Sequence, residues 1–396
     1  MNAGESSILA INGGSSTIRF ALFPARQSRN ALLRGKVDRI GSGDMTLTTS
    51  ATASAAPQHH GIGAGDHAKA VDYLLTWLQS QPWFATVAGV GHRVVHGMHH
   101  TEPELITPDL VRDLERIMPF DPLHLPRELA LIAALEALLP GVPQVACFDT
   151  AFHRSMPQVA KLLPIPRRYQ AAGVERYGFH GLSYAYCMDE LQQCGDPAAH
   201  RGRVILAHLG SGASLAAVND GRSIDTSMAF TSEAGIPMST RSGDLDPGLG
   251  HYLAETEKMS AAQFQHMVSH ESGLLGISET SADVRELLAL EGEDTRAAEA
   301  IALFCYQVKK WIGSFAAALG GVDTLVFAGG IGENSPPVRG RICAGLEFLG
   351  VELDASRNAS SVALISTAAS RVAVRVVRTD EEIMLARAVW QHLENS

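Results

Sequence analysis

Short apolar runs recur along the chain, and three of them lead directly into loops of glycine and hydroxyl residues. These loops read Gly-Gly-Ser-Ser-Thr at residues 13–17, Gly-Ser-Gly-Ala-Ser at 210–214 and Gly-Gly-Ile-Gly-Glu-Asn at 329–334. An apolar run of this length predicts a buried strand, and glycines at its end let the backbone turn sharply and approach a ligand. Backbone N–H groups and hydroxyls in such loops can bind an anion. Three such loops predict a site that binds one polyphosphate, together with its nucleoside, from several sides.

The other apolar segments alternate between strand-like and helix-like spacing. Residues 8–11 and 17–23 predict a hairpin around the first loop, and residues 204–209, 214–218 and 222–224 predict a meander that turns at Asn219-Asp220-Gly221. Residues 41–66, rich in Gly, Ala, Ser and Thr, predict surface strands or an irregular excursion. Further strands are predicted at 87–96, 144–148, 322–327 and 372–377, and helices at 68–78, 126–139, 297–319 and 380–393.

The pattern restarts after about residue 150. Both halves begin with a hairpin around a glycine loop and continue into helices, which indicates an internal duplication. A chain of 396 residues is also too long for one ordinary core. We therefore expect two α/β domains.

Composition narrows the class of partner. A formal net charge of -10 argues against nucleic acid or an anionic membrane as the main partner, so an anionic substrate must be bound by local arginines. The five cysteines form no C-x-x-C pair, which favours buried thiols in a reducing cytoplasm. We expect no signal peptide and no membrane span. The histidine pairs at 59–60 and 99–100 match no zinc pattern, so we expect no histidine-bound metal.

Candidate chemistry gathers between the first and second loops and shortly after the second. Asp149 ends a predicted strand, where we expect an exposed functional carboxylate. A strand through 91–97 would place Arg93 and Val95 on one face and His92 and His96 on the other. Three further residues lie in turn-forming contexts: His124 between two prolines, His180 between two glycines, and Arg241 close to Asp244 and Asp246.

These residue types suit phosphoryl transfer, whose catalysis is mostly positioning and charge neutralisation. Arginine binds carboxylate and phosphate oxygens bidentately. Magnesium prefers carboxylates and phosphate oxygens, so Asp149 and the acidic triplet 380–382 are candidate ligands. The triplet has an equally good alternative role as the acidic first turn of the last helix. A single Arg–Asp pair or turn histidine would otherwise be interpreted as structural.

The combined motifs resemble the acetate kinase family, a branch of the actin, sugar-kinase and chaperone-ATPase superfamily. The resemblance covers essentially the whole chain. It rests on segments 91–97, 148–153, 177–181, 225–228, 240–247, 272–278 and 330–335.

The resemblance implies an α/β fold of two actin-like (ribonuclease-H-like) domains, with mixed sheets flanked by helices and a ligand cleft between them. Residues 1–150 with 380–396 would form an N-terminal acyl and phosphate domain, and 151–379 a nucleotide-binding domain. The implied reaction is reversible, Mg²⁺-dependent (or Mn²⁺-dependent) phosphoryl transfer from ATP to acetate, giving acetyl phosphate and ADP. The family is dimeric and cytoplasmic.

The resemblance also implies residue roles. Arg93 and Arg241 would hold the carboxylate and the phosphoryl group, His180 would stabilise the transition state, and Asp149 is the essential acidic residue. Because acetate is already ionised at neutral pH, we expect Asp149 to orient Arg93 and metal-bound water more than to take a proton. Asn12 and Glu381 would form the metal site, and Val95, Leu123 and Phe179 would line the methyl pocket. Nucleotide contacts would come from Arg19, His208, Leu209, Gly210, Ser211, Gly212, Asp283, Val284, Arg285, Gly330, Ile331, Gly332, Glu333 and Asn334.

Several positions depart from the family pattern, and they affect acyl specificity and turnover more than reaction class. Arg19 replaces the usual lysine of the first loop, and five other departures are Met98, Leu182, Tyr184, Ser211 and Ser232. One alternative is a propionate or other short-chain acyl kinase, because a small apolar pocket separates one methylene by only about 1–3 kcal/mol. A second is a non-catalytic nucleotide-binding switch, which would not need Arg93, Asp149, His180 and Arg241.

Overall fold

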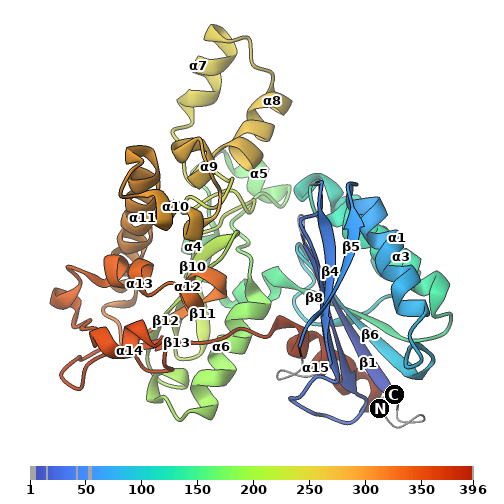
Figure 1. Ribbon diagram of the computed structural model, residues 1–396. Helices are drawn as coiled ribbons and strands as arrows, with labels where there is room; N and C mark the ends of the chain where they lie inside the picture. Colours follow the sequence, from blue (N-terminus) through green and yellow to red (C-terminus); the bar gives the residue numbers. More distant parts are fainter. Residues whose placement is uncertain (1–5, 15–16, 42, 52–55, 395–396) are drawn as a thin grey trace. The chain divides into compact units, whose positions relative to one another are not determined.

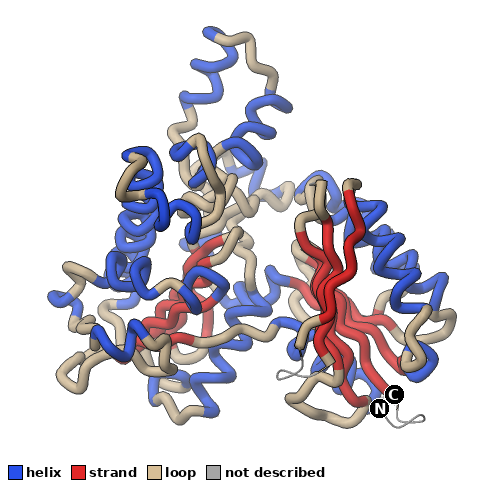
Figure 2. Tube along the Cα trace, viewed as in Figure 1, coloured by secondary structure: helices blue, strands red, loops and turns tan. Residues whose placement is uncertain are grey.

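The structure is a computed structural model that describes residues 6–14, 17–41, 43–51 and 56–394. The chain forms two compact units (Figure 1). Unit 1 comprises Met1–Ala151 and Asp380–Ser396, and unit 2 comprises Phe152–Thr379. Each unit has its own sheet with helices packed on it (Figure 2). The predicted pair of mixed sheets flanked by helices is confirmed.

Unit 1 is built on an eight-stranded sheet in the order β5-β4-β3-β2-β1-β6-β8-β7. β1 pairs antiparallel with β2 and parallel with β6, which is parallel to β8. The strands are β1 (Ser7–Gly13), β2 (Ile18–Pro24), β3 (Leu33–Asp38), β4 (Met45–Ser50), β5 (Gln58–Gly63), β6 (Val87–Val94), β7 (Glu104–Leu105) and β8 (Gln144–Phe148). The main helices are α1 (His67–Gln79), α2 (Pro108–Ile117), α3 (Leu125–Leu138) and α15 (Glu381–Glu394).

The two faces of this sheet bury different helices because strand side chains alternate. Leu9, Ile11 and Val90 join the core cluster that includes Leu74 of α1 and Leu135 of α3. The opposite face packs on α15, which buries its apolar side there (Figure 1). The predicted chain-terminal helix thus completes the first unit.

Unit 2 is built on a five-stranded sheet in the order β11-β10-β9-β12-β13. Residues of α6, including Cys187 and Leu191, pack on Leu206 and Val326 at one face, and α11 packs against β9 and β10. The strands are β9 (Arg203–Leu209), β10 (Ala213–Asn219), β11 (Arg222–Thr226), β12 (Thr324–Ala328) and β13 (Ala373–Val376). The helices are α4 (Gln158–Lys161), α5 (Arg167–Ala171), α6 (Gly181–Gln193), α7 (Gly248–Thr256), α8 (Ala261–His266), α9 (Gly273–Ser278), α10 (Val284–Leu290), α11 (Thr295–Leu319), α12 (Gly329–Asn334), α13 (Pro336–Cys343) and α14 (Ala355–Ala359).

The two sheets share one topology, which supports the predicted duplication. The order β3-β2-β1-β6-β8 in unit 1 repeats as β11-β10-β9-β12-β13 in unit 2. The pairings match as well: β9 is antiparallel to β10 and parallel to β12, which is parallel to β13. The extra strands β4, β5 and β7 belong to unit 1 alone.

Some local predictions are wrong. β6 ends at Val94, so Val95 and His96 lie outside the strand and do not have the alternating placement that was predicted for them. The third glycine loop forms the short helix α12, because its turn closes into i→i+4 bonds such as that from Ser335 N to Ile331 O. Cys194 is exposed, whereas the other four cysteines are buried free thiols as expected.

Within the described residues, no helix combines the length and apolar character that a membrane span requires.

The packing of α15 on β6 predicts a large effect of one methyl group. A Cβ at Gly91 would lie 2.7 Å from the carbonyl oxygen of Leu385, whereas a Cβ at Gly61 would meet nothing within 4 Å. We expect Gly91→Ala to lower the free energy of unfolding by roughly 1–3 kcal/mol, as overpacking does, and Gly61→Ala to leave it nearly unchanged. Thermal unfolding of both variants measures this. Equal stability of the two would contradict the close packing.

Candidate active site

A buried ion pair joins the ends of β6 and β8 in unit 1. Arg93 Nη2 lies 2.6 Å from Asp149 Oδ2, and Arg93 Nε donates to the same oxygen at 3.0 Å. The Asp149 side chain is 1% exposed and that of Arg93 is 15% exposed. The predicted exposure of Asp149 is therefore wrong: the residue follows the buried strand β8 and turns inward to the guanidinium. Burial opposes the charge of Arg93, but the charges of Asp149 and Glu381 raise its pKa above the ordinary value.

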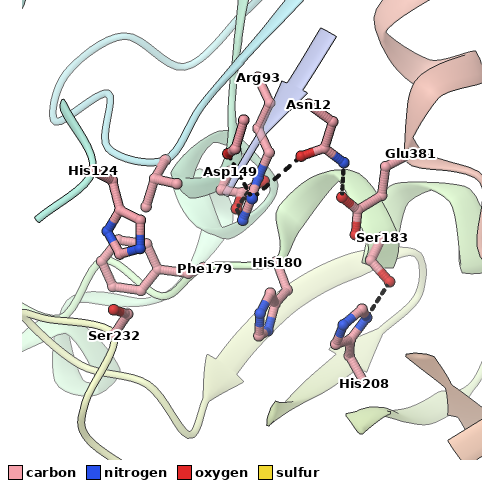
Figure 3. A network of polar contacts seen from close by, with 12 residues as sticks. Asn12, Arg93, His124, Asp149, Phe179, His180, Ser183, His208, Ser232 and Glu381 are labelled. Atoms are coloured by element: carbon pink, nitrogen blue, oxygen red, sulfur yellow. Dashed lines mark hydrogen bonds and ion pairs between the residues drawn. The ribbon is translucent and has the colours of Figure 1, made fainter. Parts of the chain in front are cut away.

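Asn12, at the end of β1, connects this pair to α15 (Figure 3). Its Oδ1 accepts a hydrogen bond from Arg93 Nη1 at 3.3 Å, and its Nδ2 donates to Glu381 Oε2 at 2.8 Å. A second carboxylate, that of Glu382, accepts from the same amide at 3.3 Å. The β1, β6 and β8 ends adjoin because these strands are parallel neighbours, so the side chains that follow them meet.

The acidic triplet divides between the two roles that its sequence allows. Asp380 Oδ1 accepts from the backbone N–H of Ile383 at 3.1 Å, as a helix-capping residue does, and Asp380 also pairs with Arg34. Glu381 and Glu382 instead face Asn12. Burial and the neighbouring charge of Glu381 raise the pKa of Glu382, and the charge of Arg19 opposes that shift. Arg19 is exposed on β2 and pairs in register with Asn12.

Glu128 of α3 fixes the position of Val95. Both of its carboxylate oxygens accept from the backbone N–H of Val95, at 3.1 and 3.2 Å. Burial, aided by the charge of Asp121, raises the pKa of Glu128 well above its ordinary value. Val95 is buried, Leu123 is half-buried, and His124 stands next to Leu123 as the residue that precedes α3, with its Nδ1 2.8 Å from Asp121 Oδ1.

In unit 2, His180 precedes α6 in a left-handed conformation with φ of 61°. Its Nδ1 lies 2.8 Å from Ser214 Oγ, which also bonds the hydroxyl of Tyr184. The His180 ring stacks on that of His208 at a centroid distance of 4.3 Å. His208 in turn contacts Ser183 Oγ through Nδ1 at 2.7 Å (Figure 3). The hydroxyl groups of Ser214 and Ser183 thus hold the two rings, and Tyr184, a departure from the family pattern, bonds the Ser214 hydroxyl.

The second and third glycine segments adjoin because β9 and β12 are parallel neighbours. A Cβ at Gly329 would lie 2.7 Å from the carbonyl oxygen of Leu209, and one at Gly210 would lie 3.9 Å from the backbone nitrogen of Gly330. A Cβ at Gly212 would lie 3.3 Å from His180 Nε2 and 3.7 Å from Arg241 Nη1. Unit 2 therefore brings both glycine segments, His180 and Arg241 together.

The segment that carries Arg241 is held by the backbone on several sides. Arg241 Nη1 donates to the carbonyl oxygen of Ser232 at 3.1 Å. Ser239 N donates to Ser211 O at 3.1 Å, and Ser239 Oγ donates to Ala282 O at 2.9 Å. Ser239 thereby connects the second glycine loop to the segment that precedes Asp283.

Asp283 and Glu333 make structural contacts. Asp283 caps α10 by accepting from the N–H of Arg285 at 2.8 Å, and the hydrogen bonds from Arg285 lower the pKa of Asp283. Glu333 Oε1 accepts from Thr379 N at 3.1 Å. The fully buried Arg339 donates to the carbonyl oxygens of Gly332 and Glu333 at 2.7 and 3.0 Å, which holds the end of α12.

Asp244 and His153 turn out to support the backbone. Asp244 Oδ1 accepts from Gly235 N at 2.8 Å. His153 is fully buried, with Nε2 3.1 Å from the carbonyl oxygen of Phe179 and Nδ1 2.9 Å from Ser223 Oγ. His153 thus supports the turn before His180.

Sequence reasoning missed several supporting residues: Glu128, Ser183, Ser214, Ser239 and Arg339. Nothing in their local pattern distinguishes them, because each acts through a contact with a distant segment. Ser15 and Ser16 of the first glycine loop lie outside the described residues.

The fold and these side chains define a phosphotransferase of the actin-like class: two sheets of one topology, with glycine segments, buried arginine and acidic residues at strand ends. The chain belongs to the acetokinase family, whose sequence model matches residues 7–387. It is 42% identical over 393 residues to the acetate kinase of Methylocella silvestris, covering 96% of each chain. It is 41% identical over 390 residues to that of Rhodopseudomonas palustris, covering 97% of this chain and 98% of that protein.

Solved structures agree. The acetate kinase of Porphyromonas gingivalis superposes with a TM-score of 0.86 at 35% identity, over 98% of this chain and 100% of that one. A propionate kinase from Francisella tularensis superposes with a TM-score of 0.89 at 33% identity, over 98% of this chain and 99% of that one.

Three buried histidines predict loss of stability in acid. Burial lowers the pKa of His92, His96 and His153 to about 4. Because an unfolded chain binds these protons near the ordinary pKa of 6.5, stability falls as pH drops from about 6.5 towards 4. We expect a loss of about 2 kcal/mol per histidine between pH 7 and pH 5. Denaturant unfolding at the two pH values, for the protein and for His92→Gln, measures the effect.

His92→Gln removes one titrating group but keeps an amide that can bond Gln144, the partner of His92 Nε2 at 2.6 Å. The slope of stability against pH should therefore be shallower in the variant. An identical slope in both proteins would show that His92 does not titrate between the two states.

Proposed function

We propose that this chain is an acetate kinase, which reversibly transfers the γ-phosphoryl group of ATP to acetate with Mg²⁺ (or Mn²⁺) as cofactor. The observation that carries the proposal is Arg93, an arginine oriented by the buried Asp149 in a chain of the acetokinase family. A guanidinium held in this way binds a small carboxylate through paired hydrogen bonds.

Arg93 and Arg241 neutralise charge in the proposed reaction. The attacking group is a carboxylate oxygen and the transferred group is a phosphoryl, so negative charge must be balanced on both. Acetate is ionised at neutral pH, so the nucleophile needs no proton removed. We therefore assign Asp149 to the orientation of Arg93. Arg93 binds Asp149 through Nε and Nη2, and its Nη1 donates to Asn12, one of the two residues proposed to bind the metal ion.

His180 stabilises the transferring phosphoryl group in this proposal. Its Nδ1 lies 2.8 Å from Ser214 Oγ, and a Cβ at Gly212 of the second glycine loop would lie 3.3 Å from its Nε2, which places the ring beside the loop proposed to bind phosphate. A preorganised donor of this kind is worth roughly 3–4 kcal/mol of barrier. Tyr184 bonds the same serine and so helps to fix the ring.

The nucleotide is proposed to bind unit 2 through the glycine segments. A Cβ at Gly210 would lie 3.2 Å from the carbonyl oxygen of Gly212, and one at Gly329 would lie 2.7 Å from that of Leu209. Glycine at these two positions keeps the segments free of side chains, so backbone N–H groups can approach the phosphates. The full proposed set is Arg19, His208, Leu209, Gly210, Ser211, Gly212, Asp283, Val284, Arg285, Gly330, Ile331, Gly332, Glu333 and Asn334.

The residues at the N-terminal end of α15 fit a magnesium ion. Asn12 and Glu381 offer an amide and a carboxylate oxygen, which magnesium accepts as ligands. Burial and, after it, the charge of Glu381 raise the pKa of Glu382, and a cation would offset that negative charge. Bound there, the ion would neutralise phosphate charge. Asn12 Oδ1 also accepts a hydrogen bond from Arg93, so the proposed metal site is connected to the arginine proposed to bind the carboxylate.

Three apolar residues, Val95, Leu123 and Phe179, are proposed to contact the methyl group of acetate. Glu128 fixes Val95 through its backbone, and Phe179 is buried and held through His153. The Francisella propionate kinase, at 33% identity, makes propionate the specific alternative.

Acyl specificity decides between the two substrates. We expect kcat/KM, measured by trapping the acyl phosphate as hydroxamate, to be highest for acetate and to fall for propionate and butyrate. One methylene should change it by roughly 10-fold or more, the equivalent of about 1–3 kcal/mol. A clear preference for propionate would assign the chain to the alternative. Binding of ATP without any acyl phosphate would favour a non-catalytic switch.

Arg241 is expected to act on the phosphoryl group and not on nucleotide affinity. Arg241→Ala should reduce kcat by about 10²–10³-fold, because a preorganised charge donor is lost. The Kd for an ATP analogue should change less than threefold, as calorimetry can determine. Arg222→Ala, at an exposed arginine of β11, is the matched control. Unchanged turnover in Arg241→Ala would remove this residue from the site.

We also propose that the protein is a cytoplasmic homodimer, as the family resemblance implies. Tyr252 of α7 and Tyr306 of α11 are 61% and 57% exposed, and such apolar surface is typical of an interface. Light scattering should give a mass of twice 42.2 kDa. A mass of 42.2 kDa at micromolar concentration would show a monomer.

A further inference from the structure

His99, His100 and Asp113 come together in unit 1, outside the residues assigned to phosphoryl transfer. His99 and His100 follow β6 in the connection to β7, and Asp113 lies on α2. Each side chain offers a donor atom, and these atoms lie within 4.8 Å of one another. The histidine pair at 99–100 matches no zinc pattern in the sequence, because the third residue of the cluster, Asp113, lies on a helix 13 positions after His100.

His100 has the environment of a metal ligand. It is 8% exposed and its ring stacks on Phe148 at a centroid distance of 5.4 Å, with an interplanar angle of 23°. Its Nδ1 lies 2.8 Å from Glu104 Oε1. Its Nε2 is buried without a hydrogen-bond partner in the part of the chain that the structure describes.

This pairing with Glu104 prepares the ring for a cation. A carboxylate that accepts from Nδ1–H fixes the tautomer in which Nε2 carries the lone pair. Buried polar atoms in proteins are nearly always bonded, so an unsatisfied Nε2 needs an explanation. A bound metal ion supplies one.

The other two side chains can complete the set. The His99 ring lies 4.2 Å from the His100 ring, and Asp113 is 32% exposed and bonded to Arg116 of the same helix turn at 2.9 Å. Neighbouring ligand atoms on a tetrahedral zinc ion are about 3.3 Å apart. His99 and Asp113 are not fully buried, so modest rotation of their side chains can close the remaining distance.

We propose that His99, His100 and Asp113 bind one divalent transition metal of the zinc class, with Glu104 as the residue that positions His100. Two imidazoles and one carboxylate match zinc, whereas the oxygen ligands at Asn12 and Glu381 match magnesium. Three protein ligands leave a position for water, so the ion is exchangeable. The metal joins the segment after β6 to α2 and stabilises unit 1.

Zinc titration of the full-length chain tests this site. Calorimetry in excess Mg²⁺, which keeps the carboxylates near Asn12 occupied, should give one Zn²⁺ per chain and a rise in Tm. His99→Ala and Asp113→Asn should each weaken zinc binding by more than tenfold, and Glu104→Ala by about 10–100-fold. His59→Ala, at the other histidine pair, should bind zinc as the unaltered protein does.

The Tm of each variant without zinc serves as the control for correct folding. It should match the Tm of the unaltered protein, because His99 and Asp113 are surface-accessible. Equal zinc affinity in the unaltered protein and in either His99→Ala or Asp113→Asn would overturn the site. Failure of the unaltered protein to bind Zn²⁺ at micromolar concentration would overturn it equally. Neither result depends on kinase activity, so the proposed function is tested separately.

Discussion

The buried ion pair between Arg93 and Asp149 is the interaction on which the first half of the candidate site depends. Asp149 is almost fully enclosed, and an enclosed carboxylate without a cation would cost several kcal/mol. The pair therefore locks the end of β6 to the end of β8. Asn12 accepts a hydrogen bond from Arg93 and donates one to Glu381, which connects the pair to β1 and to α15. Four elements that are distant in sequence are held by one polar network because each charge needs its partner.

Repetition of the sheet topology gives each unit strand ends that can carry chemistry, but the two units use them differently. Unit 1 places charged side chains there, whereas unit 2 places glycine segments at the ends of β9 and β12. His180 and Arg241 adjoin the second glycine loop in unit 2. This division suits a reaction in which one partner is a small carboxylate and the other is a nucleotide polyphosphate.

Apolar periodicity predicts most of the elements, because strands and helices bury their apolar faces in each unit. It predicts the strand Gln144–Phe148 at its true bounds but not the burial of Asp149 directly after it, which depends on a contact with Arg93. It also extends β6 too far, since the chain leaves the sheet after Val94. Polar contacts between distant segments are harder still to predict from the sequence. Glu128 under Val95 and Ser214 beside His180 carry no local signal.

The role of Asp149 in orienting Arg93 is tested most directly by a double-variant cycle on kcat/KM for acetate, with Arg93→Lys, Asp149→Glu and the combined variant. If Asp149 acts through Arg93, the combined variant should be at least about fivefold more active than the product of the two separate losses predicts, a coupling of about 1 kcal/mol. Separate losses that multiply to within a factor of two would contradict this dependence and give Asp149 a role of its own.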